Sequence, residues 1–165
     1  LSFYLAGARI SDVLRIKWCD LNDGRLYYKM EENNKVGSVK ITSKAERIIN
    51  LYKARKNKLD AIVLPELNKA DITDNKEIYR KITSAKIKYN KCLKKIAKKV
   101  RITKIISCHI ARHSIGNISG DKIPVQMLQK LYRHSNITTT INYQQSFINR
   151  ETDSALEAVI GTDDK

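Results

Sequence analysis

The chain has 165 residues, a length typical of a single domain with its own hydrophobic core. Its 32 Lys and Arg against 17 Asp and Glu give a formal net charge of +15, which favours a polyanionic partner. No apolar run approaches the roughly 20 residues of a membrane span, and no secretory leader pattern is visible. The three cysteines lack paired metal spacing. We therefore expect a cytoplasmic protein with reduced thiols, and neither a membrane protein nor a disulfide scaffold.

The first third of the sequence predicts helices and one hairpin. Residues 1–6 are mostly apolar and end at Gly7, and helical spacing follows from Ile10 to Trp18, so Arg9 falls at the corner between two helices. After a turn at 23–24, we expect strands at 25–30 and 38–42 around a polar tip at 31–37. Ser43 with Glu46 matches a capping box and predicts a helix through residue 52.

The remainder predicts a mainly helical structure. Residues 62–65 read as a short extended segment, and Asp74 with Glu77 predicts the cap of a long helix with an apolar stripe from 78 to 100. Between Lys76 and Lys104 twelve residues are basic and only Glu77 is acidic, which favours a phosphate-facing surface over a merely solvated one. Shorter helices are expected at 108–118 after Ser107, from Pro124 to 132, at 137–143 and at 150–160.

Several side chains could together handle a phosphate. His109 and Arg112 are three residues apart, hence on one helix face. Arginine forks match phosphate oxygens and stay charged, and a tyrosine hydroxyl can act as a covalent nucleophile. The set proposed from the sequence comprises Arg9, His109, Arg112, His134 and Tyr143. Spacing alone is a weak argument, because a lone helical tyrosine is usually structural.

These residues lie inside three longer motifs. Residues 6–14 (AGARISDVL) resemble the first arginine box of the tyrosine recombinase (phage-type integrase) family, residues 109–113 (HIARH) its histidine-x-x-arginine box, and residues 131–143 (LYRHSNITTTINY) its histidine-to-tyrosine box. The boxes come in the family order. The resemblance implies an α+β, mainly helical catalytic domain with a small antiparallel sheet near the N-terminus.

The resemblance also implies a role for each residue. Arg9 and Arg112 would clamp the scissile phosphate, His109 would assist proton transfer at the nucleophile, and His134 would hydrogen-bond the phosphate. Tyr143 would form a 3′-phosphotyrosine intermediate, so the enzyme would be a site-specific DNA recombinase that needs no metal, ATP or other cofactor. His113 would have a structural role.

The sequence departs from the family pattern at two positions. Where the family has a lysine that protonates the leaving oxygen, the hairpin has Glu32, so we expect Lys35 on the same tip to be the general acid, with Lys29 in reserve. Arg133 stands where the family favours glycine before the histidine, and could add a phosphate contact or crowd the turn.

The family also predicts the protein's assembly. We expect residues 1–165 to be one catalytic domain, preceded in the whole protein by a helical core-binding domain. The partner would be double-stranded DNA, bound in a bacterial cytoplasm by a homotetramer in which the tail at 146–165 docks on a neighbour. The isolated chain would be a monomer whose tail could equally pack on its own domain.

Three other hypotheses stay open or are disfavoured. A type IB topoisomerase uses similar residues, and Glu32 leaves room for a non-catalytic DNA-binding relic. Zinc binding at His109 and His113 is disfavoured, since Ile110 stands where a zinc protease has glutamate. The target site, its direction, the host element and the base-reading residues are not encoded in any recognisable pattern.

Overall fold

The structure is a computed structural model that describes residues 1–31, 35–55, 58–67, 70–71, 73–120 and 122–161. The chain divides into two compact units, Leu1–Arg112 and His113–Lys165. The expectation of one catalytic domain over residues 1–165 stays a prediction. No helix within the described ranges is both long and apolar enough to cross a membrane.

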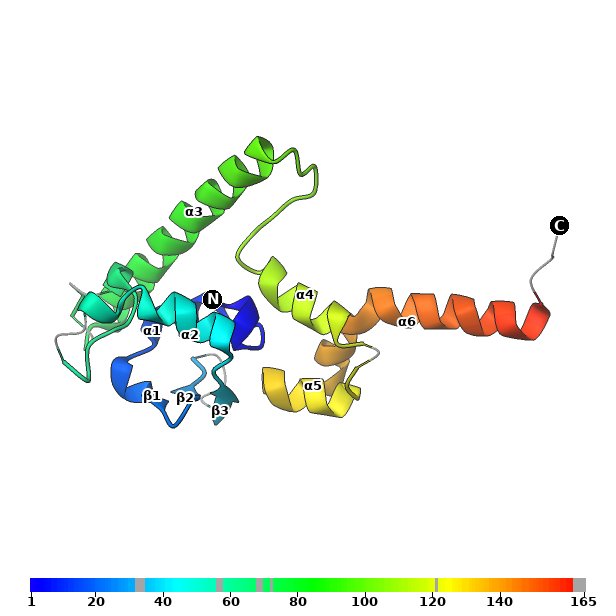
Figure 1. Ribbon diagram of the computed structural model, residues 1–165, viewed down its shortest axis with the longest axis horizontal. Coiled ribbons are helices and arrows are strands. Elements are labelled where there is room, and N and C mark those ends of the chain that lie inside the picture. The colour runs from blue at the N-terminus through cyan, green and yellow to red at the C-terminus, as the bar shows by residue number, and fades with distance from the viewer. Residues whose placement is uncertain (32–34, 56–57, 68–69, 72, 121, 162–165) are drawn as a thin grey trace. The chain divides into compact units, whose positions relative to one another are not determined.

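The first unit contains the small antiparallel sheet and the longest helix (Figure 1). Its elements in chain order are η1 (Phe3–Leu5), α1 (Ile10–Arg15), η2 (Trp18–Asp20), β1 (Leu21–Asn22), β2 (Arg25–Lys29), β3 (Val36–Lys40), α2 (Ser43–Asn50), η3 (Lys53–Arg55), η4 (Pro65–Leu67) and α3 (Asn75–Lys99). The second unit comprises α4 (Ile110–Ile118, beginning at the end of the first), α5 (Val125–Tyr132) and α6 (Ile137–Ile160). The predicted α+β, mainly helical class is confirmed.

The sheet pairs β1, β2 and β3 in that order, and all neighbours are antiparallel. Leu26 on β2 lies opposite Val39 on β3, and both side chains are buried, so one face of the hairpin belongs to the core. β3 begins at Val36, two residues before the predicted start, and β1 was not predicted. The core of this unit brings together apolar side chains of η1, α1, the sheet, α2, the 62–67 segment and the first half of α3.

Helix α1 ends earlier than the sequence predicts. Periodic apolar residues extend to Trp18, yet the helix stops at Arg15. The next residues instead pair with the segment around Ile62: Trp18 N donates to Ala61 O at 3.0 Å, and Val63 N donates to Ile16 O at 2.8 Å. Tertiary pairing thus outweighs local helical periodicity.

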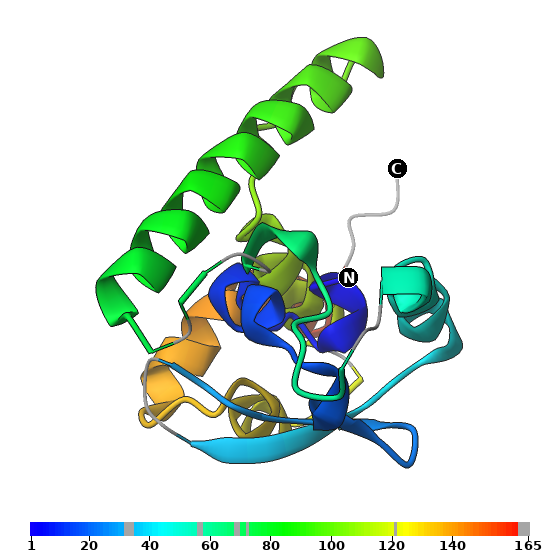
Figure 2. The same cartoon turned by 90° about the vertical axis from the view of Figure 1, so that its left-hand side faces the viewer.

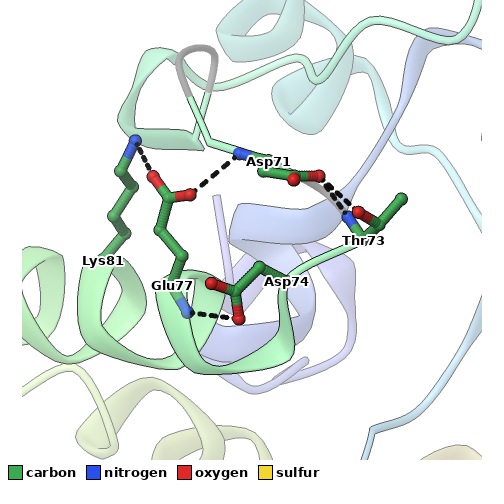
Figure 3. Close-up of polar contacts among 5 residues, drawn as sticks. All are labelled: Asp71, Thr73, Asp74, Glu77 and Lys81. Carbon is green, nitrogen blue, oxygen red and sulfur yellow. Dashed lines mark hydrogen bonds and ion pairs between the residues drawn. The ribbon is translucent and has the colours of Figure 1, made fainter.

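Helix starts depend on single polar side chains. The N-cap of α2 is Thr42, whose Oγ1 accepts from Ala45 N at 3.3 Å, so the predicted capping box at Ser43 is wrong by one residue. The predicted cap of α3 is confirmed: Asp74 Oδ1 accepts from the backbone N of Lys76 at 2.8 Å and of Glu77 at 3.2 Å. Figure 3 shows the hydrogen bond from Glu77 N to Asp74.

The network around Glu77 joins the loop before α3 to the helix (Figure 3). Its carboxylate accepts from Asp71 N at 3.2 Å and pairs with Lys81 Nζ at 2.9 Å. Hydrogen bonds from Lys81 and from the Asp71 backbone hold the pKa of Glu77 below its usual value. Helix α3 therefore begins at a defined point.

The apolar stripe of α3 is buried mainly in its first half. Ile78, Ile82 and Ala85 are buried, whereas Ile96 and Val100 are more than half exposed. In Figure 2 the second half of α3 extends beyond the rest of its unit. With 25 residues the helix is about 37 Å long.

In the second unit α5 and α6 pack against each other. Leu128 and Tyr132 of α5 and Thr140 of α6 are fully buried. Pro124 occupies the N-cap of α5, and Asn136 caps α6 by accepting from Thr138 N at 2.8 Å. Two helices were predicted at 137–143 and 150–160; the structure has one continuous helix, because no Gly or Pro interrupts the sequence between them.

Candidate active site

The predicted site residues fall on both units. Arg9, Lys35, His109 and Arg112 belong to the first. His134 and Tyr143 belong to the second.

Arg112 is anchored in the first unit. Only 2% of its surface is exposed, and its Nη1 donates to the carbonyl oxygen of Gly7 at 3.1 Å. Gly7 has φ +71°, a left-handed conformation that glycine adopts without strain, and it lies two residues before Arg9. The turn that precedes Arg9 thus also anchors Arg112.

Asp12 is a candidate site residue that the sequence interpretation missed. It lies one helical turn after Arg9 and is 4% exposed, and its Oδ1 accepts from Glu31 N at 3.2 Å. Burial raises the pKa of Asp12 above its ordinary value, while the charges of Arg9 and Arg112 act in the opposite direction. Asp12 is therefore a buried counter-charge to both arginines, and its position in the first turn of α1, three residues after the N-cap Arg9, was the signal for it.

The hairpin that carries Lys35 is joined to α1 at its base. Glu31 forms an ion pair with Arg15 in addition to its bond with Asp12. Met30 N donates to Lys35 O at 3.0 Å and closes the tip. The side chains of Lys35 and Lys29 are both exposed, and the choice of Lys35 as general acid stays a prediction. Glu32 lies outside the described residues.

His109 lies in the turn before α4. The predicted helix start at Cys108 is wrong by two residues, because Ile110 is the first helical residue and its N donates to Ser107 O at 3.1 Å. His109 is exposed, and its carbonyl accepts from Arg112 N at 3.0 Å. Cys108 N donates to Asn90 Oδ1 at 2.9 Å, and partial burial raises the pKa of the Cys108 thiol.

His134 is held in one orientation by the second unit. Its backbone N donates to Gln129 O at 3.2 Å, and its carbonyl accepts from Gln129 Nε2 at 3.2 Å. Its ring Nδ1 lies 2.9 Å from Oγ1 of the fully buried Thr140. Thr140 therefore orients the imidazole, a role that the sequence signalled only through its threonine run.

Arg133 adopts the left-handed conformation that ends α5, with φ 53° and ψ 32°. Glycine takes this conformation without the clash that a Cβ causes, which gives a physical reason for a glycine preference at this position. Arg133 is 8% exposed, so its side chain is buried in spite of its charge.

Tyr143 lies on α6, nine residues after His134, and is half-buried. Its ring stacks on His134, with centroids 5.5 Å apart at 30°, and meets the edge of Tyr132 at 5.3 Å and 82°. The second unit thus brings the predicted nucleophile and histidine together. In the described ranges no group of three or more His, Cys, Asp or Glu is arranged to hold a metal ion.

The fold is that of a tyrosine recombinase catalytic domain. The structure is similar to the crystal structure of XerA recombinase, with a TM-score of 0.65 at 13% identity, covering 93% of this chain and 54% of that chain. It is also similar to a lambda integrase dimer bound to a COC′ core site, with a TM-score of 0.53 at 14% identity, covering 87% of this chain and 49% of that chain. The chain thus spans about half the length of these solved structures.

The sequence matches the model of the phage integrase family over residues 2–150. The chain belongs to the phage integrase family. A search of curated proteins found no match.

Proposed function

We propose that this chain is the catalytic part of a tyrosine recombinase that cuts and rejoins double-stranded DNA. The observation that carries the proposal is the stacking of Tyr143 on His134, whose imidazole is itself oriented by Thr140. A half-buried tyrosine held against an oriented histidine suits a nucleophile that must keep one geometry. The lambda integrase structure, described as bound to a core site, supports DNA as the substrate.

In the proposed reaction Tyr143 Oη attacks the phosphorus of a DNA phosphodiester. A bond forms between Oη and phosphorus, and the bond from phosphorus to the 5′ oxygen breaks, which leaves a 3′-phosphotyrosine and a free 5′-hydroxyl. A 5′-hydroxyl from another strand reverses the attack. One phosphoester bond replaces another at each step, so the reaction requires no energy from nucleotide hydrolysis.

The other residues act on charge and protons. Arg9 and Arg112 stabilise the pentavalent transition state, and anchoring a guanidinium on Gly7 O removes the need to order it during the reaction. His134 hydrogen-bonds a phosphate oxygen, His109 assists removal of the tyrosine proton, and Lys35 protonates the leaving 5′ oxygen. Asp12 keeps the arginines in place as their counter-charge.

Helix α3 supplies a surface for the DNA backbone. Lys88, Lys91 and Lys95 are exposed and line a shallow hollow on this helix, one face of which they share at helical spacing. Lysines in such a row neutralise successive phosphates without reading bases, and binding then weakens steeply with salt.

The tail supports assembly on DNA as a tetramer. Leu156, Val159 and Ile160 are between 56% and 85% exposed, so these apolar side chains are available to a neighbouring protomer. This exposure favours docking on a neighbour over packing on the tail's own unit, the two alternatives that the sequence leaves open.

The test is covalent trapping on DNA with a nick next to the cleavage position. We expect a protein–DNA adduct with the wild type and none with Tyr143→Phe. If the wild type binds DNA and never forms the adduct, the protein is a binding module. If relaxation of supercoiled DNA occurs without strand exchange between two sites, it is a topoisomerase of type IB.

The general acid is located with a substrate in which sulfur replaces the bridging 5′ oxygen. Thiolate leaves without protonation, so loss of the true acid is rescued by this substrate. We expect rescue of Lys35→Ala, with Lys29→Ala as the matched control on the same hairpin. Rescue of Lys29→Ala alone assigns the role to Lys29.

A further inference from the structure

The ring of Tyr143 is in contact with a second imidazole besides that of His134. His113 on α4 stacks on it, with centroids 4.5 Å apart at 28°, which is closer than the 5.5 Å of His134. The tyrosine ring is therefore stacked on two imidazoles and meets the edge of Tyr132. The sequence predicts only a structural role for His113, and the geometry places it against the proposed nucleophile.

Gly116 explains how α4 and α6 approach closely enough for this contact. A Cβ at position 116 would lie 2.7 Å from Tyr143 Cβ and 3.0 Å from Tyr143 O. Both atoms are close to the backbone and cannot move aside as the end of a flexible side chain would. Gly116 lies three residues after His113, so both occupy the same face of α4. Because Gly116 has no Cβ, the Cβ and backbone of Tyr143 can lie against the face of α4 that carries His113.

A side-chain hydrogen bond stabilises the end of α4 next to Gly116. Ser119 Oγ donates to Gly116 O at 2.9 Å, and Ser119 is buried. His113 itself is exposed, so its stacking contributes little to the buried core of the unit. An exposed side chain that stacks on the proposed nucleophile points to a role in positioning.

We propose that His113 is a positioning residue for Tyr143, acting through its stacked imidazole, and that Gly116 sets the approach of the two helices. The inference rests on the proposed function, because it assigns the attack to Tyr143. Stacking on both imidazoles limits rotation of the phenol ring about its Cα–Cβ and Cβ–Cγ bonds. The Oη then stays in the direction from which it attacks.

The contact is tested first without any catalysis. In NMR spectra of the 165-residue chain, the ring current of Tyr143 shifts the ring protons of His113 upfield, and Tyr143→Ala abolishes the shift. Unchanged His113 resonances in Tyr143→Ala would overturn the inference. This NMR result does not depend on DNA cleavage. Failure of the proposed function is recognised separately, because the wild type would then form no covalent adduct with DNA.

The role is then tested by single-turnover cleavage of the nicked DNA. An aromatic pair contributes about 0.5–1.5 kcal/mol beyond the area it buries, so His113→Ala should slow cleavage by roughly two- to tenfold. DNA affinity should be unchanged. His113→Phe keeps a stacking ring and should cleave within about twofold of the wild type. Ile118→Ala, at an exposed position of the same helix, is the matched control.

Two results would refute the role. One is cleavage by His113→Ala at the wild-type rate. The other is a His113→Phe variant as slow as His113→Ala, which would mean that the imidazole acts by proton transfer and not by stacking. Gly116→Ala should slow cleavage more than it weakens DNA binding, and a folded Gly116→Ala variant with wild-type cleavage would refute the role of the close approach.

Discussion

The C-terminal end of α3 stores conformational strain that one substitution should release. Ile102 N donates to Ala97 O at 2.9 Å and Arg101 N donates to Lys98 O at 3.2 Å, the hydrogen-bond pattern of a Schellman cap. The residue at the left-handed position of this cap is Arg101, with φ 56°. The position is exposed, so its side chain is not needed for packing.

The expected gain follows from the backbone alone. A side chain in the left-handed region costs about 1–2 kcal/mol, and the larger freedom of glycine in the unfolded chain offsets about 0.4–1 kcal/mol. Arg101→Gly should therefore raise the free energy of unfolding by roughly 1 kcal/mol. For a chain of this size that corresponds to a rise in Tm of about 2–4 °C.

Arg101→Ala is the matched control, because it removes the same charge and retains the Cβ. Differential scanning calorimetry of both variants isolates the conformational contribution. Equal Tm values for Arg101→Gly and Arg101→Ala would refute the reasoning, since they would show that the backbone at this cap carries no strain. DNA binding should weaken equally in both, because both lose one basic side chain.

Three further predictions concern the first unit. Burial raises the pKa of Asp12, so the stability that this carboxyl contributes is present below its unfolded pKa and is lost as pH rises through its folded pKa; urea unfolding across pH should show this loss in the wild type and not in Asp12→Asn, which cannot ionise. Thr42→Ala should lower the free energy of unfolding by about 1 kcal/mol, and Ser43→Ala should lower it much less. A larger loss in Ser43→Ala would instead identify Ser43 as the N-cap of α2. Lys91→Glu with Lys95→Glu should flatten the salt dependence of DNA binding, and an unchanged slope would remove α3 from the interface.

The sequence predicted the elements that depend on local signals. Asp74 at the start of α3 and the alternating strands of the hairpin were recognised because capping and pairing use neighbours in the chain. Helix α1 could not be bounded this way, since its end depends on pairing with residues near Ile62. Helix α6 is continuous where two helices were predicted, because loss of the apolar pattern does not end a helix when no Gly or Pro follows.

The identities of the site residues came from motifs, but their contacts did not. Asp12, Thr140 and Gly116 each act on a residue at least three positions away in sequence, and for Gly116 the contact is 27 positions distant. A sequence motif does not specify how closely two helices approach each other in the fold. The hydrogen bond between Thr140 and His134 and the stacking of His113 on Tyr143 therefore required the folded structure.

The continuity of α6 has a mechanical consequence. Tyr143 and the exposed tip at Ile160 belong to one unbroken helix, about 25 Å apart along its axis. An intact helix is stiff over this length, so it transmits rotation and translation from one end to the other. In the proposed assembly, a neighbouring protomer that binds the tip of α6 would therefore also influence the orientation of Tyr143 at the other end of the helix.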